Sequence, residues 1–294
     1  METTLDLPPG YRIADVIAFH GRDGEAVAEQ VGPDGLRKGV LLDGVPTLLD
    51  IRFDGRVAHC RIEHDGPATP ALQALTHDAL LNVLGLRIDP AAFAAFAKND
   101  PVLGSLLARQ PGLRIVQSAT VFEALTWAII GQQINLSFAI ALRRSFIQQA
   151  GRPHLGGLWC YPEAHDVARL ELDQLTSRKF SRAKAETLLR LARLVAEGEL
   201  QLDAHADDMA TIGARLLAIK GIGPWTVNYA LLRGYGDPDC SLHGDVAVRT
   251  AIGRLLGADT RPDIAQAEAF LAAYRPHRTM AAAYLWASLN QPAA

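Results

Sequence analysis

The sequence predicts an α+β N-terminal unit followed by an all-α region that fills the rest of the chain. Up to about residue 65, apolar and polar side chains alternate or run apolar around turn dipeptides such as Asp54-Gly55, which is typical of strands joined by hairpins. Beyond residue 90 the strand patterns stop, and apolar residues at helical spacing alternate with glycine and proline. At 294 residues the chain is long enough for two or three domains.

Composition excludes several classes of protein. Apolar residues make up 49% and charged residues 21% of the chain, a globular balance that excludes a disordered protein. The acidic N-terminus lacks the apolar segment of a signal peptide, and polar side chains interrupt the most apolar stretch, residues 121–142, so we expect no membrane partner. Cys60, Cys160 and Cys240 are too few and too far apart for a disulfide framework or a four-cysteine iron–sulfur cluster. We therefore expect a cytoplasmic protein without such a cluster.

The net charge of −3 is unevenly spread. Residues 1–112 hold 10 Lys/Arg against 15 Asp/Glu, a balance of −5, whereas residues 113–294 hold 19 against 17, a balance of +2. The second part is therefore the better candidate to meet a polyanion, although the bias is mild.

The N-terminal unit combines short strands with a leucine-rich helix and ends near residues 88–90. Residues 14–19 fit either a strand or a helix. The expected strands are 40–42, 47–53 and 56–62, and the expected helix is 70–88.

In the second part, Thr120 and Glu123 have the spacing of a capping box at the start of a helix. Further helices are expected over residues 137–149, 181–196, 212–219, 224–232, 246–255, 265–274 and 279–288.

The most informative stretch runs from residue 216 to residue 229. Its turn, Gly221-Ile222-Gly223-Pro224, follows one helix and opens the next, with Pro224 at a first helical position. The glycines let another backbone come close, and the turn leaves unpaired N–H groups where a phosphate oxygen can bind. The turn predicts a helix-hairpin-helix motif that contacts a nucleic-acid backbone. A plain glycine–proline connection without a ligand is the alternative.

Two features near this turn point to chemistry. Trp225 and Tyr229 lie four residues apart and share one helix face, which suits either a core or a platform on which a base stacks. Asp245 precedes the helix 246–255 at an N-cap position. A capping carboxylate is held ionised by N–H groups and the helix dipole, which is also the state that opposes a developing positive charge. A cap without a catalytic role is the alternative.

Taken together, these motifs resemble the helix-hairpin-helix DNA glycosylases with a Gly/Pro-rich loop and a catalytic aspartate, specifically the 3-methyladenine-DNA glycosylase II branch. The resemblance covers about residues 100–290. The matching segments are Pro111-Gly112-Leu113-Arg114, Phe122-Glu123-Ala124-Leu125, Ile129-Ile130-Gly131-Gln132-Gln133-Ile134, Gly221-Ile222-Gly223-Pro224-Trp225-Thr226, Asn228-Tyr229 and Gly244-Asp245.

The resemblance implies an α+β N-terminal domain (1–89) followed by an all-α helix-hairpin-helix glycosylase core of two helical subdomains. One subdomain spans 113–236 and contains the hairpin. The other combines 90–112 with 237–294 and carries the aspartate.

The implied activity is hydrolysis of the N-glycosidic bond of alkylated purines in double-stranded DNA that contains a damaged base, by a monomer. Asp245 matches the catalytic aspartate. Trp225, Tyr229 and Trp286 match positions of the aromatic base pocket. Lyase-competent relatives carry a lysine where this chain has Trp225, so the resemblance implies no lyase activity. Alternatives are a glycosylase for deaminated or oxidised bases, for which Gln132 is the candidate hydrogen-bonding group of the pocket, and a helix-hairpin-helix protein that binds DNA without catalysis.

The remaining implied sites concern the DNA backbone and a cation. The hairpin residues Gly221, Ile222, Gly223 and Thr226 would contact phosphates. Gln133, with Ile134 as its competitor, would fill the gap left by the flipped base. No organic cofactor is implied, whereas a structural Na⁺ or K⁺ could be held by three hairpin carbonyls, those of Leu217, Ile219 and Gly221.

Overall fold

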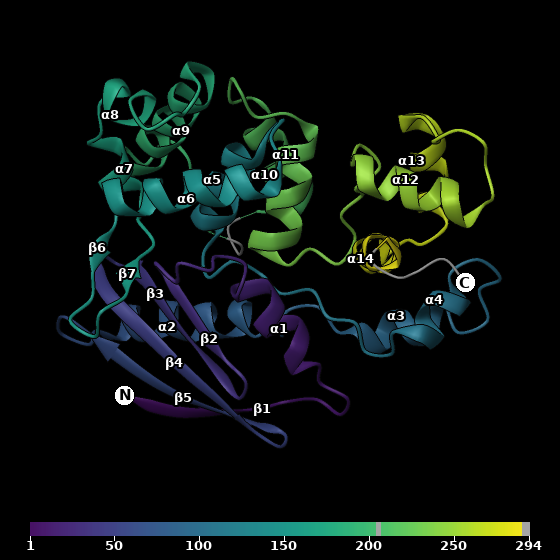
Figure 1. The fold of residues 1–294 in the computed structure, drawn as a ribbon, viewed down its shortest axis with the longest axis horizontal. Coiled ribbons are helices and arrows are strands. Elements are labelled where there is room, and N and C mark those ends of the chain that lie inside the picture. The colour runs from purple at the N-terminus through teal and green to yellow at the C-terminus, as the bar shows by residue number, and fades with distance from the viewer. Residues whose placement is uncertain (204–206, 290–294) are drawn as a thin grey trace.

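The computed structural model describes residues 1–203 and 207–289. Its N-terminal part is a five-stranded antiparallel sheet in the order β1-β5-β4-β3-β2, drawn in purple and blue in Figure 1. Helices α1 (Ile13–His20) and α2 (Pro70–Val83) contribute to the apolar core that covers one face of this sheet. The strands are β1 (Glu2–Asp6), β2 (Glu29–Gly32), β3 (Gly35–Leu42), β4 (Val45–Asp54) and β5 (Val57–His64).

The strand patterns predicted from the sequence are confirmed on β3, β4 and β5. On β5, Ala58, Cys60 and Ile62 are buried while the residues between them are exposed, as the period of two requires. Asp43 and Gly44, with φ of +50° and +72°, join β3 to β4 in a two-residue hairpin turn of the kind that needs positive φ at both positions.

Twelve further helices and one π-helical turn follow the sheet within the described residues. Figure 1 shows one group above the sheet, α5 to α11, and a second group at its side, where α12 to α14 lie beside α3 and α4. The bounds are α3 (Pro90–Phe96), α4 (Gly104–Arg109), α5 (Val121–Gly131), α6 (Leu136–Ala150), α7 (Ala164–Ala168), α8 (Leu172–Thr176), α9 (Arg182–Ala196), α10 (Met209–Leu217), α11 (Pro224–Ala230), η1 (Leu231–Tyr235), α12 (Val246–Leu255), α13 (Ile264–Ala272) and α14 (Arg278–Ser288).

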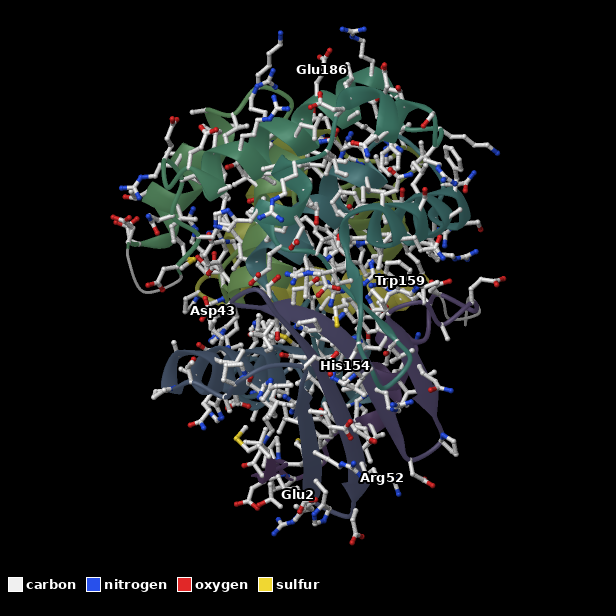
Figure 2. All side chains as sticks on the ribbon, turned by 90° about the vertical axis from the view of Figure 1, so that its left-hand side faces the viewer. Glu2, Asp43, Arg52, His154, Trp159 and Glu186 are labelled. Carbon is white, nitrogen blue, oxygen red and sulfur yellow. The ribbon has the colours of Figure 1, made fainter. Side chains whose placement is uncertain are left out.

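Strand structure does not stop at residue 90, which corrects the expectation from sequence. The segment after α6 forms a small hairpin of β6 (Arg152–Pro153) and β7 (Trp159–Cys160). Tyr161 continues it along β3, where its N–H donates to Gly39 O at 3.1 Å. A side chain on Gly39 would lie 2.3 Å from the carbonyl oxygen of Trp159, so glycine at 39 permits this contact. Figure 2 shows Trp159 and His154 of this hairpin against the sheet.

The expected capping box at the start of α5 is only half formed. Thr120 accepts a hydrogen bond from the N–H of Glu123 at 3.1 Å, as an N-cap should. The carboxylate of Glu123 does not return to Thr120. It accepts instead from the N–H of Ala119 and from the side chains of Lys38 and Arg143.

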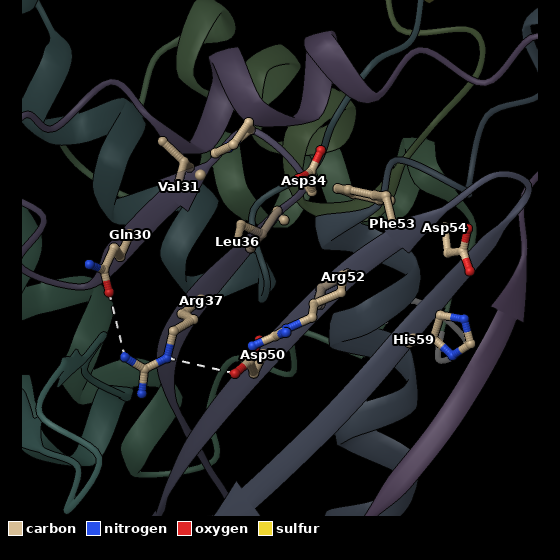
Figure 3. Close-up of a pocket in the computed structure, with 14 residues that line it drawn as sticks. Gln30, Val31, Asp34, Leu36, Arg37, Asp50, Arg52, Phe53, Asp54 and His59 are labelled. Atoms are coloured by element: carbon tan, nitrogen blue, oxygen red, sulfur yellow. Dashed lines mark hydrogen bonds and ion pairs between the residues drawn. The ribbon is translucent and has the colours of Figure 1, made fainter.

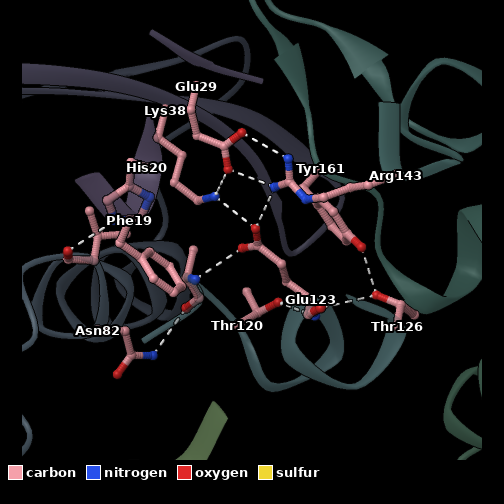
Figure 4. Close-up of polar contacts among 12 residues, drawn as sticks. Phe19, His20, Glu29, Lys38, Asn82, Thr120, Glu123, Thr126, Arg143 and Tyr161 are labelled. Atoms are coloured by element: carbon pink, nitrogen blue, oxygen red, sulfur yellow. Dashed lines mark hydrogen bonds and ion pairs between the residues drawn. The ribbon is translucent and has the colours of Figure 1, made fainter. Parts of the chain in front are cut away.

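Those side chains belong to a buried ionic cluster that joins the sheet to the helices (Figure 4). Lys38 on β3 donates to Glu29 on β2 at 2.5 Å and to Glu123 on α5 at 2.8 Å, and it is fully buried. Arg143 on α6 donates to the same two carboxylates at 2.6 and 2.8 Å. Burial alone would raise the pKa of both carboxyls, but Arg143 and Lys38 outweigh it and hold both pKa values below the usual range.

In the described part of the chain, no helix has the length and apolar character needed to cross a membrane.

Candidate active site

The candidate site is a cleft of about 860 Å³ to which the ends of three helices contribute. These are the C-terminal end of α5, the start of α11 and the start of α12. The lining residues are Gly131, Gln132, Gln133, Gly223, Pro224, Trp225, Thr226, Gly244, Asp245, Val246, Ala247, Thr250, Arg254 and Leu289.

The helical hairpin predicted from the glycine–proline turn is present as α10, a tight loop and α11. Gly221 has a φ of +98°, and a Cβ there would lie 2.0 Å from Thr187 Oγ1 on α9, so both its conformation and its packing require glycine. Gly223 is different, because its φ is −104° and a Cβ there would meet nothing within 4 Å. The fold of this chain therefore does not demand glycine at 223, and the space above that backbone is open.

Not every hairpin residue predicted to contact a DNA backbone is free to do so. Ile222 is buried, and its N–H already donates to Ile219 O at 3.0 Å. Thr226 is also buried, and its hydroxyl accepts from Gln132 Nε2 at 2.9 Å. The N–H groups left to meet a ligand are those of Gly223 and of the first turn of α11, to which Trp225 and Thr226 belong.

Gln132 binds the hairpin. Its Nε2 donates to Gly221 O at 3.1 Å and to Thr226 Oγ1 at 2.9 Å, which uses both amide hydrogens. Gln132 therefore connects the end of α5 to the loop before α11, and only its Oε1 acceptor remains for a ligand in the cleft. A role as a hydrogen-bond donor to a base, which the sequence left open, is not available in this arrangement.

Asp245 is the N-cap of α12 and accepts from the N–H of Val248 at 2.9 Å through Oδ1. Two indole N–H groups also bind its carboxylate. Trp286 Nε1 donates to Oδ1 at 3.0 Å, and Trp225 Nε1 donates to Oδ2 at 2.8 Å. Both oxygens of the carboxylate are therefore oriented by donors on three different helices, in the wall of the cleft.

Of the aromatic residues predicted for the base pocket, Trp225 and Trp286 contact Asp245, and Tyr229 lies against Trp225. The rings of Trp225 and Tyr229 lie 5.3 Å apart with a tilt of 32°. Sequence reasoning missed Trp127 on α5. Its Nε1 donates to the Tyr229 hydroxyl at 2.9 Å. Trp127 lies between two of the segments that carry the family resemblance, residues 122–125 and 129–134, and only the packing of α5 against α11 reveals this contact.

The two wedge candidates differ in exposure. Gln133 is exposed and has a φ of +55°, an uncommon conformation for a residue other than glycine, in the short loop between α5 and α6. Ile134 is half-buried and packs against the apolar core. Gln133, which also lines the cleft, is therefore the better placed to enter a DNA duplex.

The three carbonyls proposed for a monovalent cation are those of Leu217, Ile219 and Gly221. The oxygen of Ile219 accepts from the N–H of Ile222, and that of Gly221 accepts from Gln132. A carbonyl oxygen has two lone pairs, so each of these oxygens keeps one for a cation.

A second hollow, of about 550 Å³, lies on the sheet beside β2, β3 and β4 (Figure 3). Arg37 crosses it, 3.5 Å from Gln30 and 3.9 Å from Asp50. Because its central charges pair with one another at the surface of the sheet, we do not assign chemistry to this hollow. The cleft at Asp245 remains the candidate active site.

The fold and the cleft define a helix-hairpin-helix protein with a capped aspartate between tryptophans. The family model for HhH-GPD superfamily base excision DNA repair proteins matches residues 126–276. The DNA-3-methyladenine glycosylase of Bacillus subtilis is 32% identical over 202 residues, which make up 67% of this chain and 67% of that relative. This chain belongs to the HhH-GPD superfamily.

Two solved structures show how far the fold extends. The 3-methyladenine DNA-glycosylase from Archaeoglobus fulgidus matches with a TM-score of 0.82 and 20% identity over 97% of both chains. The Schizosaccharomyces pombe 3-methyladenine DNA glycosylase, solved with abasic DNA, matches with a TM-score of 0.60 and 22% identity, over 68% of this chain and 97% of its own. The whole α+β and helical architecture therefore recurs in the first structure, while the second lacks a counterpart to about a third of this chain.

Proposed function

We propose that this protein is a monofunctional DNA glycosylase that hydrolyses the N-glycosidic bond of alkylated purines, of the 3-methyladenine type, in duplex DNA and so initiates base excision repair in the cytoplasm. The observation that carries the proposal is the Asp245 carboxylate, fixed by Val248, Trp225 and Trp286 in a cleft of about 860 Å³. The Bacillus subtilis relative bears the name of this activity.

The reaction needs a negative charge at the sugar. As the bond between C1′ and the base nitrogen breaks, its electron pair leaves with the base and positive charge develops on the sugar. The ionised Asp245 opposes that charge, and a water molecule then adds its oxygen to C1′ and releases one proton to the solvent. A methylated purine is already cationic and departs as a neutral molecule, so it needs little help from an acid. A damaged base must leave the duplex to reach the cleft, where aromatic rings favour a cationic base.

The DNA contacts that we propose use the hairpin and the loop after α5. The N–H groups of Gly223 and Thr226 would hold a phosphate, and Gln133 would occupy the space vacated by the flipped base. The carbonyls of Leu217, Ile219 and Gly221 would hold a Na⁺ or K⁺ that steadies the hairpin. We expect the protein to act as a monomer without an organic cofactor.

We further infer two helical subdomains with the cleft between them, α5 to α11 on one side and α3, α4 and α12 to α14 on the other. We also expect no β-lyase activity, since that reaction needs an amine nucleophile at the sugar. Among the described residues that line the cleft there is no lysine, and the position that matches the lyase nucleophile is Trp225.

The test is release of free base from methylated duplex DNA by the wild type and by Asp245→Asn. The substitution removes the charge and keeps an oxygen that can cap α12. We expect base release to fall by at least about 100-fold while DNA binding persists. Asp263→Asn is the matched control, because Asp263 caps α13 through the same hydrogen bond, at 2.8 Å to the N–H of Gln266, and does not line the cleft. No release by the wild type, together with tight DNA binding, would instead identify a binding protein without catalysis.

A further inference from the structure

One face of α12 runs along the cleft at Asp245. Val246, Thr250 and Arg254 are spaced four residues apart on the helix that Asp245 caps, so they share this face, and all three line the cleft. Val246 and Arg254 are exposed, and Thr250 is half-buried. The Cα–Cβ bonds of a helix tilt toward its N-terminus, so Arg254 starts out toward the end that carries Asp245. The carboxylate and the arginine therefore face the same cleft.

Arg254 is a cation without a partner. Within residues 1–203 and 207–289, its guanidinium forms no hydrogen bond and no ion pair, so all five of its N–H donors are available. Arg249, on the same helix, differs, because its Nε donates to Pro262 O at 2.8 Å. Thr250 does not compete as a donor, since its hydroxyl donates to Val246 O at 2.8 Å. Arg254 is thus the side chain on this face that can donate to a ligand.

The two charges of the cleft are kept apart. Among the described residues that line it, Arg254 is the one cation and Asp245 the one anion. They do not pair, because Asp245 accepts its hydrogen bonds from Val248, Trp225 and Trp286. Nine residues of α12 separate them, about 13.5 Å along the helix axis at 1.5 Å per residue. The cleft therefore offers a negative charge and, about two and a half helical turns away, a positive charge that nothing in it neutralises.

A DNA strand supplies the matching anion. A strand carries one phosphate for about every 3.4 Å of the duplex axis, so with the damaged nucleotide at Asp245 the phosphates of its neighbours lie within the range of Arg254. The cationic base of the proposed substrate is the wrong partner for Arg254, because like charges repel. A guanidinium, by contrast, binds two phosphate oxygens at once through parallel N–H groups.

We propose that Arg254 is a DNA-positioning residue that binds a backbone phosphate next to the damaged nucleotide. It acts from the α12 side of the cleft, while the N–H groups of Gly223 and the first turn of α11 act from the other side. Because α11 and α12 belong to different groups of helices (Figure 1), the strand is then held from both groups. This inference rests on the proposed function, since it takes damaged DNA as the ligand of the cleft.

The experiment measures how salt changes DNA affinity. The wild type, Arg254→Gln and Arg254→Lys are titrated with a duplex that holds one tetrahydrofuran abasic site, which contains no base to release, from about 50 to about 200 mM salt. Arg193→Gln is the matched control. Arg193 is an exposed arginine in the last turn of α9, as Arg254 is in the last turn of α12, but it does not line the cleft.

Arg254→Gln should bind about 10-fold more weakly at the lowest salt concentration, because it loses a charge-assisted contact. Its plot of log affinity against log salt should be shallower than that of the wild type by about 0.9, the change expected for one phosphate contact. Arg254→Lys keeps the charge, so its slope should match the wild type, while its affinity falls because lysine lacks the planar fork. Arg193→Gln should match the wild type in both quantities.

Single-turnover base release from methylated duplex DNA gives the second readout. Arg254→Gln should lose activity at limiting protein, and most of that loss should be recovered at saturating protein, because the contact positions the strand. A loss that persists in full at saturating protein would place Arg254 at the reacting sugar or base and overturn the positioning role. An unchanged salt slope in Arg254→Gln, or an equal change in Arg193→Gln, would overturn it as well.

These outcomes are separate from a failure of the proposed function. If the wild type releases base while the slope of Arg254→Gln is unchanged, this inference fails and the glycosylase proposal stands. If the wild type releases no base while the slope still changes, the glycosylase proposal fails, and Arg254 positions DNA in a protein that only binds it.

Discussion

At the scale of single residues, the two indole N–H groups on Asp245 link the base pocket to the catalytic charge. Trp225→Phe and Trp286→Phe each keep an aromatic ring but remove one donor from the carboxylate, at 2.8 and 3.0 Å respectively. A hydrogen bond to a charged group is worth about 1.5–3 kcal/mol, so we expect the single-turnover rate to fall about 10- to 100-fold with little change in DNA affinity. A loss confined to DNA affinity would show that the tryptophans only bind the base. Trp159→Phe, in β7, is the control.

His20 gives a prediction about pH. It is buried, its Nε2 lies 3.1 Å from Val83 O, and burial, with the nearby charge of Lys38, lowers the pKa of His20 to about 3. The unfolded chain takes up this proton near pH 6.5, so the stability that neutral His20 confers is complete above that pH and is lost as the pH falls toward 3. Between pH 6.5 and 5 we expect the wild type to lose about 2 kcal/mol of unfolding free energy through this residue.

Urea unfolding of the wild type and His20→Gln at both pH values checks this expectation, because glutamine keeps a donor for Val83 but does not titrate. The variant should show a flatter dependence on pH. His59→Gln, at an exposed histidine on β5, is the control. Burial also lowers the pKa of His64, which contributes a slope of the same sign to the wild type and to every variant. Equal slopes for the wild type and His20→Gln would contradict the assignment.

Single residues also show where sequence reasoning stops. Asp245 was predictable as an N-cap because an apolar helix follows it, and the pairing of Trp225 with Tyr229 follows from helical spacing. The bond from Trp286 to Asp245 spans 41 residues and depends on how α14 packs against α12, which no local pattern encodes. Phe19 belongs to the N-terminal part, which the sequence linked to no function, and its ring lies 4.7 Å from the guanidinium carbon of Arg233 in η1.

At the scale of elements, the two glycines of the hairpin should respond differently to the same substitution. Gly221→Ala introduces a Cβ 2.0 Å from Thr187 Oγ1 at a φ of +98°, and we expect it to lower the free energy of unfolding by about 2 kcal/mol or more. Gly223→Ala meets nothing within 4 Å at a φ that alanine accepts, so its stability should match the wild type.

The methyl group that Gly223→Ala adds would instead lie where a phosphate approaches the start of α11. DNA affinity should therefore fall while stability is retained. Thermal unfolding and a DNA-binding titration on both variants separate the two effects. If Gly223→Ala binds DNA as tightly as the wild type, the loop does not contact the backbone through that residue.

How well an element could be predicted from the sequence depended on its length. The bounds of α12 (Val246–Leu255) were predicted to the residue, and the leucine pattern of α2 predicted its start at Pro70. The predicted end of α2 at residue 88 was wrong, because the helix ends at Val83. The two-residue strands β6 and β7 were not, because so short a segment has no period to detect. They exist because Tyr161 pairs beside Val40, a contact that only the assembled chain provides.

At the scale of the whole molecule, the buried ionic cluster holds the sheet and the helices together. Lys38 and Glu29 come from the sheet, whereas Glu123 and Arg143 come from the helices, and the four side chains balance to zero net charge. Such a cluster costs desolvation, so its value lies in joining these two surfaces rather than in added stability. Removing one charged side chain of the cluster should therefore lower the free energy of unfolding far more than removing an oppositely charged pair.

Lys38→Met tests this arrangement, because methionine fills similar space and leaves Glu29 and Glu123 facing each other with only Arg143 between them. We expect a loss of about 3–5 kcal/mol in unfolding free energy. Lys38→Met combined with Glu29→Gln should recover a good part of that loss, since the remaining Glu123 and Arg143 then form a neutral pair. Losses that simply add in the double variant would show that the charges act independently. Because Lys38 also lowers the pKa of His20, Lys38→Met should raise that pKa toward the value of the unfolded chain, which histidine NMR titration measures directly. His20 should then cost the variant less stability than it costs the wild type as the pH falls.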